Sequence, residues 1–388
     1  MLKIKTYNAI SDKGLSKFPV EAYELGPEVE NADAYVLRSY KLHGEAVPES
    51  LLAVARAGAG TNNVPVPDYS EKGIVVFNTP GANANAVKEL VVTGMLMSCR
   101  DISGGIRFVR DLDMDDNAEM AKLLEKEKKR FAGSEIQGKT LGVVGLGAIG
   151  AMVANVALEL GMNVAGYDPA ISVEAAWRLS QSVEKMPSLE ALLAKSDFVS
   201  LHVPAIEATH HLINAERLSL CKPDAVLLNF AREQIVDSDA VLEALSAGRL
   251  RKYVTDFPSP EMIAREDVVP MPHIGASTAE AEENCAVMAA DQLMDYLENG
   301  NIENSVNFPA TSMARMGNTR ITFSNQNVPK VLGNVLSLLA DSNINVVDMI
   351  NRSRDELAYN IIDVEPEVSS NLAAEIKAVE GVLRVRIL

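Results

Sequence analysis

The sequence is short of cysteine, of long apolar runs and of positive charge, and each shortage excludes a class of protein. Its three cysteines, Cys99, Cys221 and Cys285, are widely spaced and form no C-x-x-C pair, which argues against a disulfide framework and against a zinc site. We therefore expect buried, reduced thiols and no bound metal.

The missing apolar runs and the missing positive charge bear on partners and on location. No apolar segment reaches the roughly 20 residues of a membrane-spanning helix, and the first residues lack the apolar region of a signal peptide. Lys and Arg number 36 against 53 Asp and Glu, a formal net charge of -17. This balance argues against nucleic acid or an anionic membrane as a partner, while a local basic patch can still hold a phosphorylated metabolite. We expect a cytoplasmic protein.

What is present is a long chain of ordinary globular composition. With 388 residues, 47% of them hydrophobic and 23% charged, the chain exceeds a single core and predicts two or three domains. Strand and helix patterns alternate through its middle, which predicts a parallel sheet covered by helices on both faces. Ligands of such sheets bind beyond the carboxyl ends of the strands.

One glycine-rich stretch carries the clearest chemical signal. An apolar run ending at residue 144 leads into Gly145, Gly147 and Gly150, which satisfy G-x-G-x-x-G, and a helical pattern begins at Ala148 and Ile149. The first glycine permits a tight turn, the second lets backbone approach a pyrophosphate, and the third lets helix pack on strand. The unpaired N–H groups of the helix N-terminus favour the anion. We predict a dinucleotide site here.

An acidic residue after the next strand predicts which dinucleotide binds. Residues 162–167 form a second apolar run that ends in Asp168, which follows Gly150 by 18 residues. A carboxylate at this place accepts hydrogen bonds from both ribose hydroxyls and repels a 2′-phosphate. The sequence therefore predicts NAD rather than NADP.

Polar side chains also follow four later predicted strands, at the edge of the sheet where ligands bind. Each cluster alone is unremarkable, but four in succession predict a functional site. The polar residues are His202 and Thr209, Asn229 and Arg232, Asp256 and Glu261, and His273; Val203, Pro204, Ala231 and Gly275 lie beside them in the sequence.

The order of patterns predicts a discontinuous domain organisation. Residues 1–97 form an α/β unit, and a helix predicted to begin at a capping box, Ser277 to Glu280, returns the chain to it. We expect a substrate-binding domain of residues 1–97 and 278–305, a Rossmann domain of 98–277, a linker of 306–318, and a βαββαβ, ferredoxin-like domain of 319–388.

In combination these motifs resemble the D-isomer-specific 2-hydroxyacid dehydrogenases over residues 1–305, and the last 70 or so residues resemble the ACT regulatory domain. The resemblance rests on Arg56 to Gly60, on Asn78-Thr-Pro80, on the glycine loop with Asp168, and on three further segments. Those segments are Ser200 to Pro204, Asn229 to Arg232 and Pro272 to Ser277. It implies an α/β fold in which a Rossmann-type doubly wound sheet is inserted in a flavodoxin-like substrate domain, followed by an ACT domain.

The resemblance also implies a catalytic trio. Arg232 would hold the substrate carboxylate and polarise the C2 oxygen, because its planar fork suits a carboxylate. His273 would take the C2 hydroxyl proton as hydride leaves for the nicotinamide, and Glu261 would orient the imidazole. Here Glu261 follows Asp256 in the run Asp-Phe-Pro-Ser-Pro-Glu, which differs from the family's Asp-Val-Phe-x-x-Glu. The remaining strand-end residues are expected to contact NAD.

At the substrate end, backbone N–H groups of a glycine-rich turn are expected to cradle the carboxylate, and arginines to hold a phosphate. The residues are Arg38, Ser39, Arg56, Gly58, Ala59, Gly60 and Asn83. With the ACT-like tail, they predict a phosphorylated 2-hydroxy acid of amino-acid biosynthesis. The expected reaction is NAD-dependent oxidation of D-3-phosphoglycerate to 3-phosphohydroxypyruvate, the entry step of L-serine synthesis.

The resemblance further implies a homodimer or homotetramer and a possible effector. Asn325, Asn327 and Asn345 occupy places where related tails bind L-serine, although Lys330 stands where glycine is usual. An oligomerising tail without serine binding is an equal alternative. The basic run Lys126 to Arg130 either reaches a neighbouring active site or forms a solvated helix face.

Two other functions stay open at this point. One is a different dehydrogenase or reductase of the same fold, acting on hydroxypyruvate, glyoxylate or D-lactate. The other is a binding module that senses NADH, because such relatives retain a similar arginine and histidine. Turnover on a panel of D-2-hydroxy acids separates these possibilities.

Overall fold

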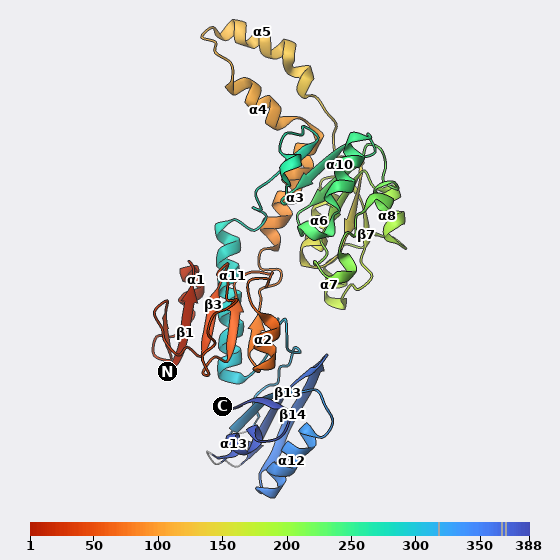
Figure 1. Ribbon diagram of the computed structural model, residues 1–388. Helices are drawn as coiled ribbons and strands as arrows, with labels where there is room; N and C mark the ends of the chain where they lie inside the picture. Colours follow the sequence, from red (N-terminus) through yellow and green to blue (C-terminus); the bar gives the residue numbers. More distant parts are fainter. Residues whose placement is uncertain (317–318, 366–367, 369–370) are drawn as a thin grey trace. The chain divides into compact units, whose positions relative to one another are not determined.

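The computed structural model describes residues 1–316, 319–365, 368 and 371–388 (Figure 1). The end of the expected linker, residues 317–318, lies outside these ranges. Contacts divide the chain into two compact units: unit 1 contains Met1–Asn83 and Thr278–Leu388, and unit 2 contains Ala84–Ser277. Within the described residues no helix is both long and apolar enough to cross a membrane.

Unit 2 is built on a seven-stranded sheet in which every pair of neighbours is parallel, as the alternating pattern predicts. The strand order is β12-β11-β10-β9-β6-β7-β8, so the order reverses between β6 and β9. The sequence therefore predicts this doubly wound, Rossmann-type sheet correctly. Its strands are β6 (Thr140–Val144), β7 (Asn163–Tyr167), β8 (Glu184–Lys185), β9 (Phe198–Leu201), β10 (Val226–Asn229), β11 (Lys252–Thr255) and β12 (Val268–Pro270).

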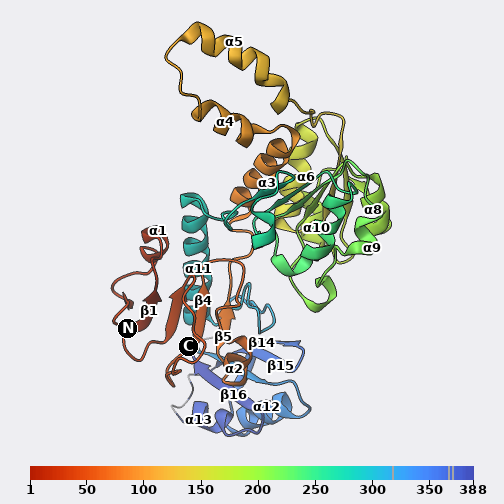
Figure 2. The ribbon, with the colours of Figure 1, turned by 45° about the horizontal axis from the view of Figure 1, so that its top comes forward.

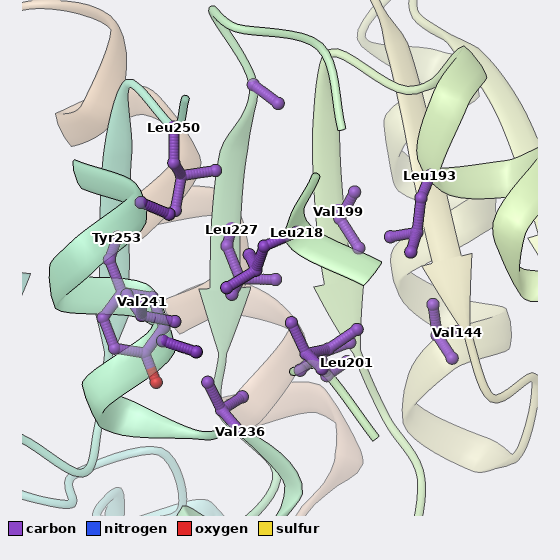
Figure 3. Close-up of a cluster of buried hydrophobic side chains, with 14 of the residues drawn as sticks. Val144, Leu193, Val199, Leu201, Leu218, Leu227, Val236, Val241, Leu250 and Tyr253 are labelled. Atoms are coloured by element: carbon purple, nitrogen blue, oxygen red, sulfur yellow. The ribbon is translucent and has the colours of Figure 1, made fainter. Parts of the chain in front are cut away.

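Helices cover both faces of this sheet because its central strands are apolar on both sides. On one face, α8 (Leu189–Lys195), α9 (Ala215–Leu218) and α10 (Ser238–Ser246) pack on the strands, and Figure 3 shows the side chains of this core. On the other lie α3 (Ala84–Cys99) and α6 (Ala148–Glu159). The short helix α7 (Val173–Arg178) has no buried residue.

The packing of helix α3 sets the boundary between the two units. Its residues Val87, Val91 and Met95 are buried against Val143 and Leu228 of the seven-stranded sheet. The division by contacts therefore falls after Asn83, whereas the sequence places the boundary after residue 97.

Two helices of unit 2 stand apart from its sheet. Neither α4 (Ile102–Arg110) nor α5 (Asn117–Glu127) has a buried residue, and Figures 1 and 2 show both extending from the rest of the unit. A one-turn 3-10 helix, Lys128–Phe131, leads the chain back. We call residues 101–133 the α4–α5 excursion.

Unit 1 contains a smaller parallel sheet with the order β2-β1-β3-β4-β5, the flavodoxin-like order. Its long helix α11 (Ala279–Asn299) packs Ala289 and Leu293 on this sheet. The other elements are β1 (Leu2–Tyr7), α1 (Asp12–Leu15), β2 (Tyr23–Gly26), β3 (Ala34–Leu37), β4 (Ala53–Arg56), α2 (Val66–Glu71) and β5 (Val75–Phe77).

The ends of α11 correct one detail of the prediction. The predicted cap, Ser277, is wrong: the Thr278 side chain caps the helix and accepts a hydrogen bond from the Ala281 N–H at 3.1 Å. The helix ends at Gly300, whose φ of 73° is the left-handed conformation that glycine adopts without strain.

The C-terminal domain of unit 1 is a four-stranded antiparallel sheet with two helices, in the predicted βαββαβ order. A buried ion pair between Arg320 and Asp363, at 2.7 Å, joins two neighbouring strands of this sheet. Arg320 also donates to the Asn299 carbonyl, which ties this domain to the end of α11. The elements are β13 (Thr319–Gln326), α12 (Val331–Asp341), β14 (Asn345–Arg354), β15 (Leu357–Glu365), α13 (Leu372–Lys377) and β16 (Val382–Ile387).

Candidate functional site

The glycine loop of unit 2 has the backbone that a pyrophosphate cradle requires. Gly145 has a φ of 89°, and a Cβ there would lie 2.7 Å from the His202 carbonyl oxygen. A Cβ at Gly150 would lie 1.9 Å from the Gly145 oxygen, so neither position admits a side chain. Gly147 precedes α6 and faces open space, and no side chain caps the helix. The first N–H groups of α6, at Ala148 and Ile149, are therefore available to an anion.

Asp168 stands against the same loop. One carboxylate oxygen accepts a hydrogen bond from the Leu146 N–H at 2.8 Å, and the other accepts one from the Ala170 N–H at 2.9 Å. Leu146 lies between the first two glycines, so the carboxylate fixes the loop as well as the end of β7. Each oxygen retains a lone pair for a further donor.

After β9, His202 is held as a neutral ring. Burial lowers its pKa to about 3, and the Ser200 hydroxyl lies 2.8 Å from its Nε2. Val203 and Pro204 follow, and the Thr209 hydroxyl donates to the Pro204 carbonyl at 2.5 Å, closing a turn. A ring with so low a pKa is a weak base and stays neutral throughout the physiological range. His202 is therefore unsuited to proton transfer. The sequence did not indicate the role of Ser200.

After β10, Asn229 shapes the backbone around Arg232. The buried Asn229 side chain donates to the Arg232 carbonyl at 2.9 Å and accepts from the Ala231 N–H at 3.2 Å. The Arg232 side chain donates to the Ala231 carbonyl at 2.6 Å, and among the described residues no carboxylate lies within 4 Å of it. Burial lowers the pKa of Arg232 without discharging it at neutral pH. The Arg232 charge is therefore available to an anionic ligand.

After β11 and β12, a buried acid holds the loop that carries His273. Asp256 is 2% exposed and accepts hydrogen bonds from the Ile274 N–H at 2.9 Å and the Gly275 N–H at 2.7 Å. The preceding residue, His273, is exposed and has a φ of 56°, a left-handed backbone that costs free energy for a non-glycine residue. Its ring contacts that of Phe257. Asp256 thus stabilises a strained loop at the candidate acid/base residue.

Glu261 lies on a turn between β11 and β12. It lies on an exposed 3-10 turn, Pro260–Met262, which is anchored by the fully buried Met262. In the described chain no hydrogen bond joins the Glu261 carboxylate to the His273 ring. The acid that the structure does tie to this loop is Asp256, through the backbone.

In unit 1, two arginines lie at the carboxyl ends of neighbouring strands. Arg38 follows β3 and forms an ion pair with Glu282 of α11, with 2.6 Å between Nη1 and Oε1. Arg56 ends β4, and its Nε donates to the Arg38 carbonyl at 3.0 Å. Ser39 donates its N–H to the Asn8 side chain at 3.2 Å. The sequence did not indicate Glu282, which only the fold brings to Arg38.

The turn after Arg56 is shaped by the Arg56 side chain, which lies close against the backbone of Gly58. A Cβ at Gly58, which has a φ of 148°, would lie 1.7 Å from Nη1 of Arg56. The Asn78 side chain donates to the Ala59 carbonyl at 2.6 Å, which fixes the turn toward Gly60. Asn83 carries a buried Oδ1 without a hydrogen-bond partner.

The three predicted effector residues differ in burial and in hydrogen bonding. Asn325 is buried, and its amide is fully engaged with the Gln326 carbonyl at 2.6 Å and the Asn360 side chain at 2.7 Å. Asn327 is exposed and donates to the Asp355 carbonyl at 3.0 Å, and Asn345 is exposed at the start of β14. Lys330 has a φ of 78° before α12, where glycine would be unstrained.

The basic run Lys126 to Arg130 mixes paired charges with an aromatic contact. Lys128 pairs with Glu125 and Arg130 pairs with Glu127, the latter at 3.1 Å. The Arg130 guanidinium also lies over the rings of Phe108 and Phe131. In the part of the chain that the structure describes, no cluster of three metal-ligating side chains occurs.

Comparison with known proteins identifies the family. Residues 92–276 match the model of the D-isomer specific 2-hydroxyacid dehydrogenase, NAD binding domain. The chain is 34% identical to D-3-phosphoglycerate dehydrogenase of Haemophilus influenzae over 356 residues, which cover 89% of this chain and 82% of that protein. The chain belongs to the D-isomer-specific 2-hydroxyacid dehydrogenases. Its cofactor is therefore NAD, in agreement with the prediction from Asp168.

Other members agree in sequence and fold. D-3-phosphoglycerate dehydrogenase of Methanocaldococcus jannaschii is 34% identical over 336 residues, 84% of this dehydrogenase but only 61% of the longer relative. The NAD-bound 3-phosphoglycerate dehydrogenase of Entamoeba histolytica has a TM-score of 0.62 at 26% identity, covering 79% of this chain and 98% of that one. D-mandelate dehydrogenase of Rhodotorula graminis, at 24% identity and a TM-score of 0.67, shares the fold.

Proposed function

We propose that this dehydrogenase oxidises D-3-phosphoglycerate to 3-phosphohydroxypyruvate with NAD, the entry step of L-serine synthesis. The observation that carries the proposal is the pair Arg38 and Arg56, at adjacent strand ends beside the turn of Gly58 to Gly60. Two guanidinium groups suit a phosphate, and backbone N–H groups suit a carboxylate. The names of the relatives from Haemophilus influenzae and Escherichia coli support the same substrate.

The residues of unit 2 fit NAD. The two glycines that exclude a Cβ, the open space before α6 and its uncapped N–H groups form a cradle for a pyrophosphate. Asp168, held against the cradle, would accept hydrogen bonds from the ribose hydroxyls. When bound, NAD supplies the hydride acceptor. Neutral His202, with Val203, Pro204, Thr209, Asn229, Ala231 and Gly275, would line the cofactor.

Arg232 and His273 would perform the chemistry on the substrate. Arg232 has a half-buried charge with no carboxylate beside it, which suits the substrate carboxylate and polarises the neighbouring C2 oxygen. His273 would remove the proton from the C2 hydroxyl, because an imidazole can act as a general base. Asp256 would hold the His273 loop, and Glu261 remains the proposed partner of the imidazole.

At the phosphate end, the arginines already have partners that the substrate must replace. Arg38 is paired with Glu282 at 2.6 Å, and both side chains are partly exposed. A phosphate carries more charge than a carboxylate and accepts more hydrogen bonds, so it competes effectively for the guanidinium. Ser39 and Asn83 would complete the substrate contacts, and the buried, unpartnered Oδ1 of Asn83 offers an acceptor to a hydroxyl.

The proposed assembly and regulation follow from the exposed parts of the chain. The α4–α5 excursion buries none of its helical residues, which favours a homodimer or homotetramer in which it is covered, with Lys126 to Arg130 approaching a neighbouring substrate. L-serine is a candidate effector of the ACT-like C-terminal domain. Asn327 and Asn345 are exposed there, whereas Asn325 is buried and bonded to its neighbours.

A substrate panel tests the proposed function. The appearance of NADH is followed with D-3-phosphoglycerate, D-glycerate and D-lactate, and its consumption with hydroxypyruvate and glyoxylate, each with and without L-serine. The proposal expects kcat/KM for D-3-phosphoglycerate to exceed the others by roughly two orders of magnitude, equivalent to about 2.7 kcal/mol. Equal or greater kcat/KM for an unphosphorylated acid contradicts it. NADH binding without turnover on any acid supports the sensing module instead.

A further inference from the structure

A pocket of unit 2 lies at the opposite end of the strands from the glycine loop. Its volume is about 410 Å³, within the range of small-molecule sites. It is lined by residues at the amino ends of β6, β9 and β11, among them Lys139, Phe198 and Lys252, whereas Gly145 follows the carboxyl end of β6. The pocket is therefore separate from the proposed cofactor site.

Four cations converge on this pocket: Arg100, Lys139, Arg251 and Lys252. For Arg100, Lys139 and Lys252, the described residues place no carboxylate within 4 Å of the charged nitrogen. Like charges gathered in one small volume repel one another unless an anion joins them. The gathering is notable in a chain whose formal net charge is -17.

Arg251 is fixed at the pocket by neutral partners. Its Nη1 donates to the Ser98 carbonyl at 3.0 Å, and its Nε donates to the Asp224 carbonyl at 3.2 Å. These contacts orient the guanidinium and leave its charge uncompensated, because a carbonyl oxygen carries no net charge. The remaining N–H groups of the fork are free for an anion.

The acids of the pocket are mostly committed elsewhere. Asp197 pairs with Lys222 at 2.9 Å and accepts a hydrogen bond from the Thr140 N–H at 2.8 Å. Asp101 caps α4 by accepting from the Gly104 N–H at 2.9 Å. A neutral N–H leaves the charge of Asp101 in place, and Asp224 is exposed, so four cations face two uncompensated carboxylates and the pocket keeps a net positive charge.

The same pocket includes the root of the α4–α5 excursion. There the Ser134 N–H donates to the Cys99 carbonyl at 3.1 Å, joining the chain that leaves the unit to the chain that returns. Gly133 approaches so closely that a Cβ would lie 1.7 Å from the Cys99 oxygen. A ligand that contacts Arg100 and Lys139 spans these two segments.

We propose that this pocket binds a compact polyanion, a phosphate or a small polycarboxylate, and that the bound anion braces the root of the α4–α5 excursion. An anion with two or three negative charges suits a pocket in which four cations face two uncompensated carboxylates. The proposal concerns binding and loop order, and it does not rest on the proposed dehydrogenase reaction.

Calorimetric titration tests the site. Citrate and inorganic phosphate are each titrated into the full chain saturated with NADH, which fills the glycine loop. The variants are Lys139→Gln with Lys252→Gln, and a control, Lys72→Gln with Lys185→Gln, in which both residues are exposed and neither lines the pocket. The control has the same net charge as the pocket variant.

The proposal expects one of the two anions to bind wild type and control equally and the pocket variant roughly tenfold more weakly or worse. Hydrogen exchange in residues 102–131 should slow on binding in wild type alone. Absence of binding to wild type overturns the proposal, as does equal weakening in the control. Loss of binding in Arg38→Gln, with the pocket variant unaffected, places the anion at the substrate end and also overturns it. If the double variant fails to fold, Arg100→Gln replaces it.

Discussion

The two parallel sheets of this dehydrogenase use polar side chains at their carboxyl ends in different ways. In the seven-stranded sheet, Asp168, Asn229 and Asp256 are hydrogen-bonded to backbone N–H or carbonyl groups of adjacent loops. In the five-stranded sheet, Arg38 is instead paired with the side chain of Glu282. The first arrangement fixes the conformation of the loops before a ligand binds. The second leaves Arg38 able to exchange Glu282 for another anion.

The difference suggests how the two sheets divide the work. Backbone-anchored polar groups position the glycine loop, Arg232 and the strained His273 loop before any ligand arrives, which suits chemistry that needs exact placement. Partly exposed ion pairs contribute little to stability and exchange partners readily, which suits recognition of a charged substrate. We expect substitutions of Asn229 and Asp256 to change kcat, substitution of Asp168 to change the choice of dinucleotide, and substitutions in the second group to change KM.

The largest expected effect is that of His273→Ala. Removing the proposed acid/base group should lower kcat by roughly two to four orders of magnitude, because proton transfer loses its catalyst. The dissociation constant of NADH, measured by fluorescence titration, should change little. His211→Ala, which removes another exposed histidine of unit 2, should keep kcat, and a kcat near wild type in His273→Ala rejects the assignment.

The next effect is expected at the cofactor. Asp168→Gly removes the carboxylate that would bind the ribose hydroxyls and repel a 2′-phosphate, so the preference for NAD over NADP should fall by roughly tenfold or more. The measurement is the ratio of kcat/KM with the two dinucleotides. A wild-type enzyme that already prefers NADP shows that Asp168 has a different role.

Asp256→Asn tests whether a backbone-anchored acid positions the chemistry. An amide presents one acceptor oxygen, so one of the two N–H groups held at 2.9 and 2.7 Å loses its partner and the left-handed backbone of His273 is less restrained. Because hydrogen bonds to charged groups contribute about 1.5–3 kcal/mol, kcat should fall by roughly tenfold. KM and NADH binding should stay close to wild type.

A matched control is Asp267→Asn, since Asp267 pairs with Arg265 on the surface of the same unit. That variant should leave kcat unchanged. If Asp256→Asn raises the NADH dissociation constant as much as it lowers kcat, Asp256 binds the cofactor rather than positioning His273.

The smallest effect is expected from Glu282→Gln in the five-stranded sheet. Releasing Arg38 from its ion pair should lower KM for D-3-phosphoglycerate by roughly two- to fivefold, because the phosphate no longer displaces a carboxylate. The gain should shrink as salt rises, and kcat should not change. Glu283→Gln, which removes the partner of Lys13 on the same helix, serves as control. A raised KM in Glu282→Gln shows that Glu282 organises the site instead.

The sequence allowed prediction of features that depend on local backbone rules. Gly145 and Gly150 could be recognised because a side chain at either place collides with backbone, and the fold order follows from alternating strands and helices. Thr278 in place of Ser277 as the helix cap was missed, because neighbouring hydroxyl residues look equivalent in sequence.

Features that depend on distant chain segments could not be predicted. Asp256 is 18 residues from Ile274, and Arg38 is far from Glu282, so only the folded sheet brings each pair together. The left-handed backbone of His273 could not be read from the sequence, because histidine is enriched in this conformation but adopts it at only a minority of positions. Glu261 was assigned by spacing alone, and spacing does not reveal that its turn is exposed.

The division of work between the two sheets is tested most directly by Arg38→Gln. The measurement is kcat/KM for D-3-phosphoglycerate and for D-glycerate, its unphosphorylated counterpart, in wild type and variant. The account predicts that the ratio of the two falls by roughly tenfold, with kcat/KM for D-glycerate unchanged, because only the phosphate loses a contact. An equal fall for both substrates, or no fall for either, contradicts it.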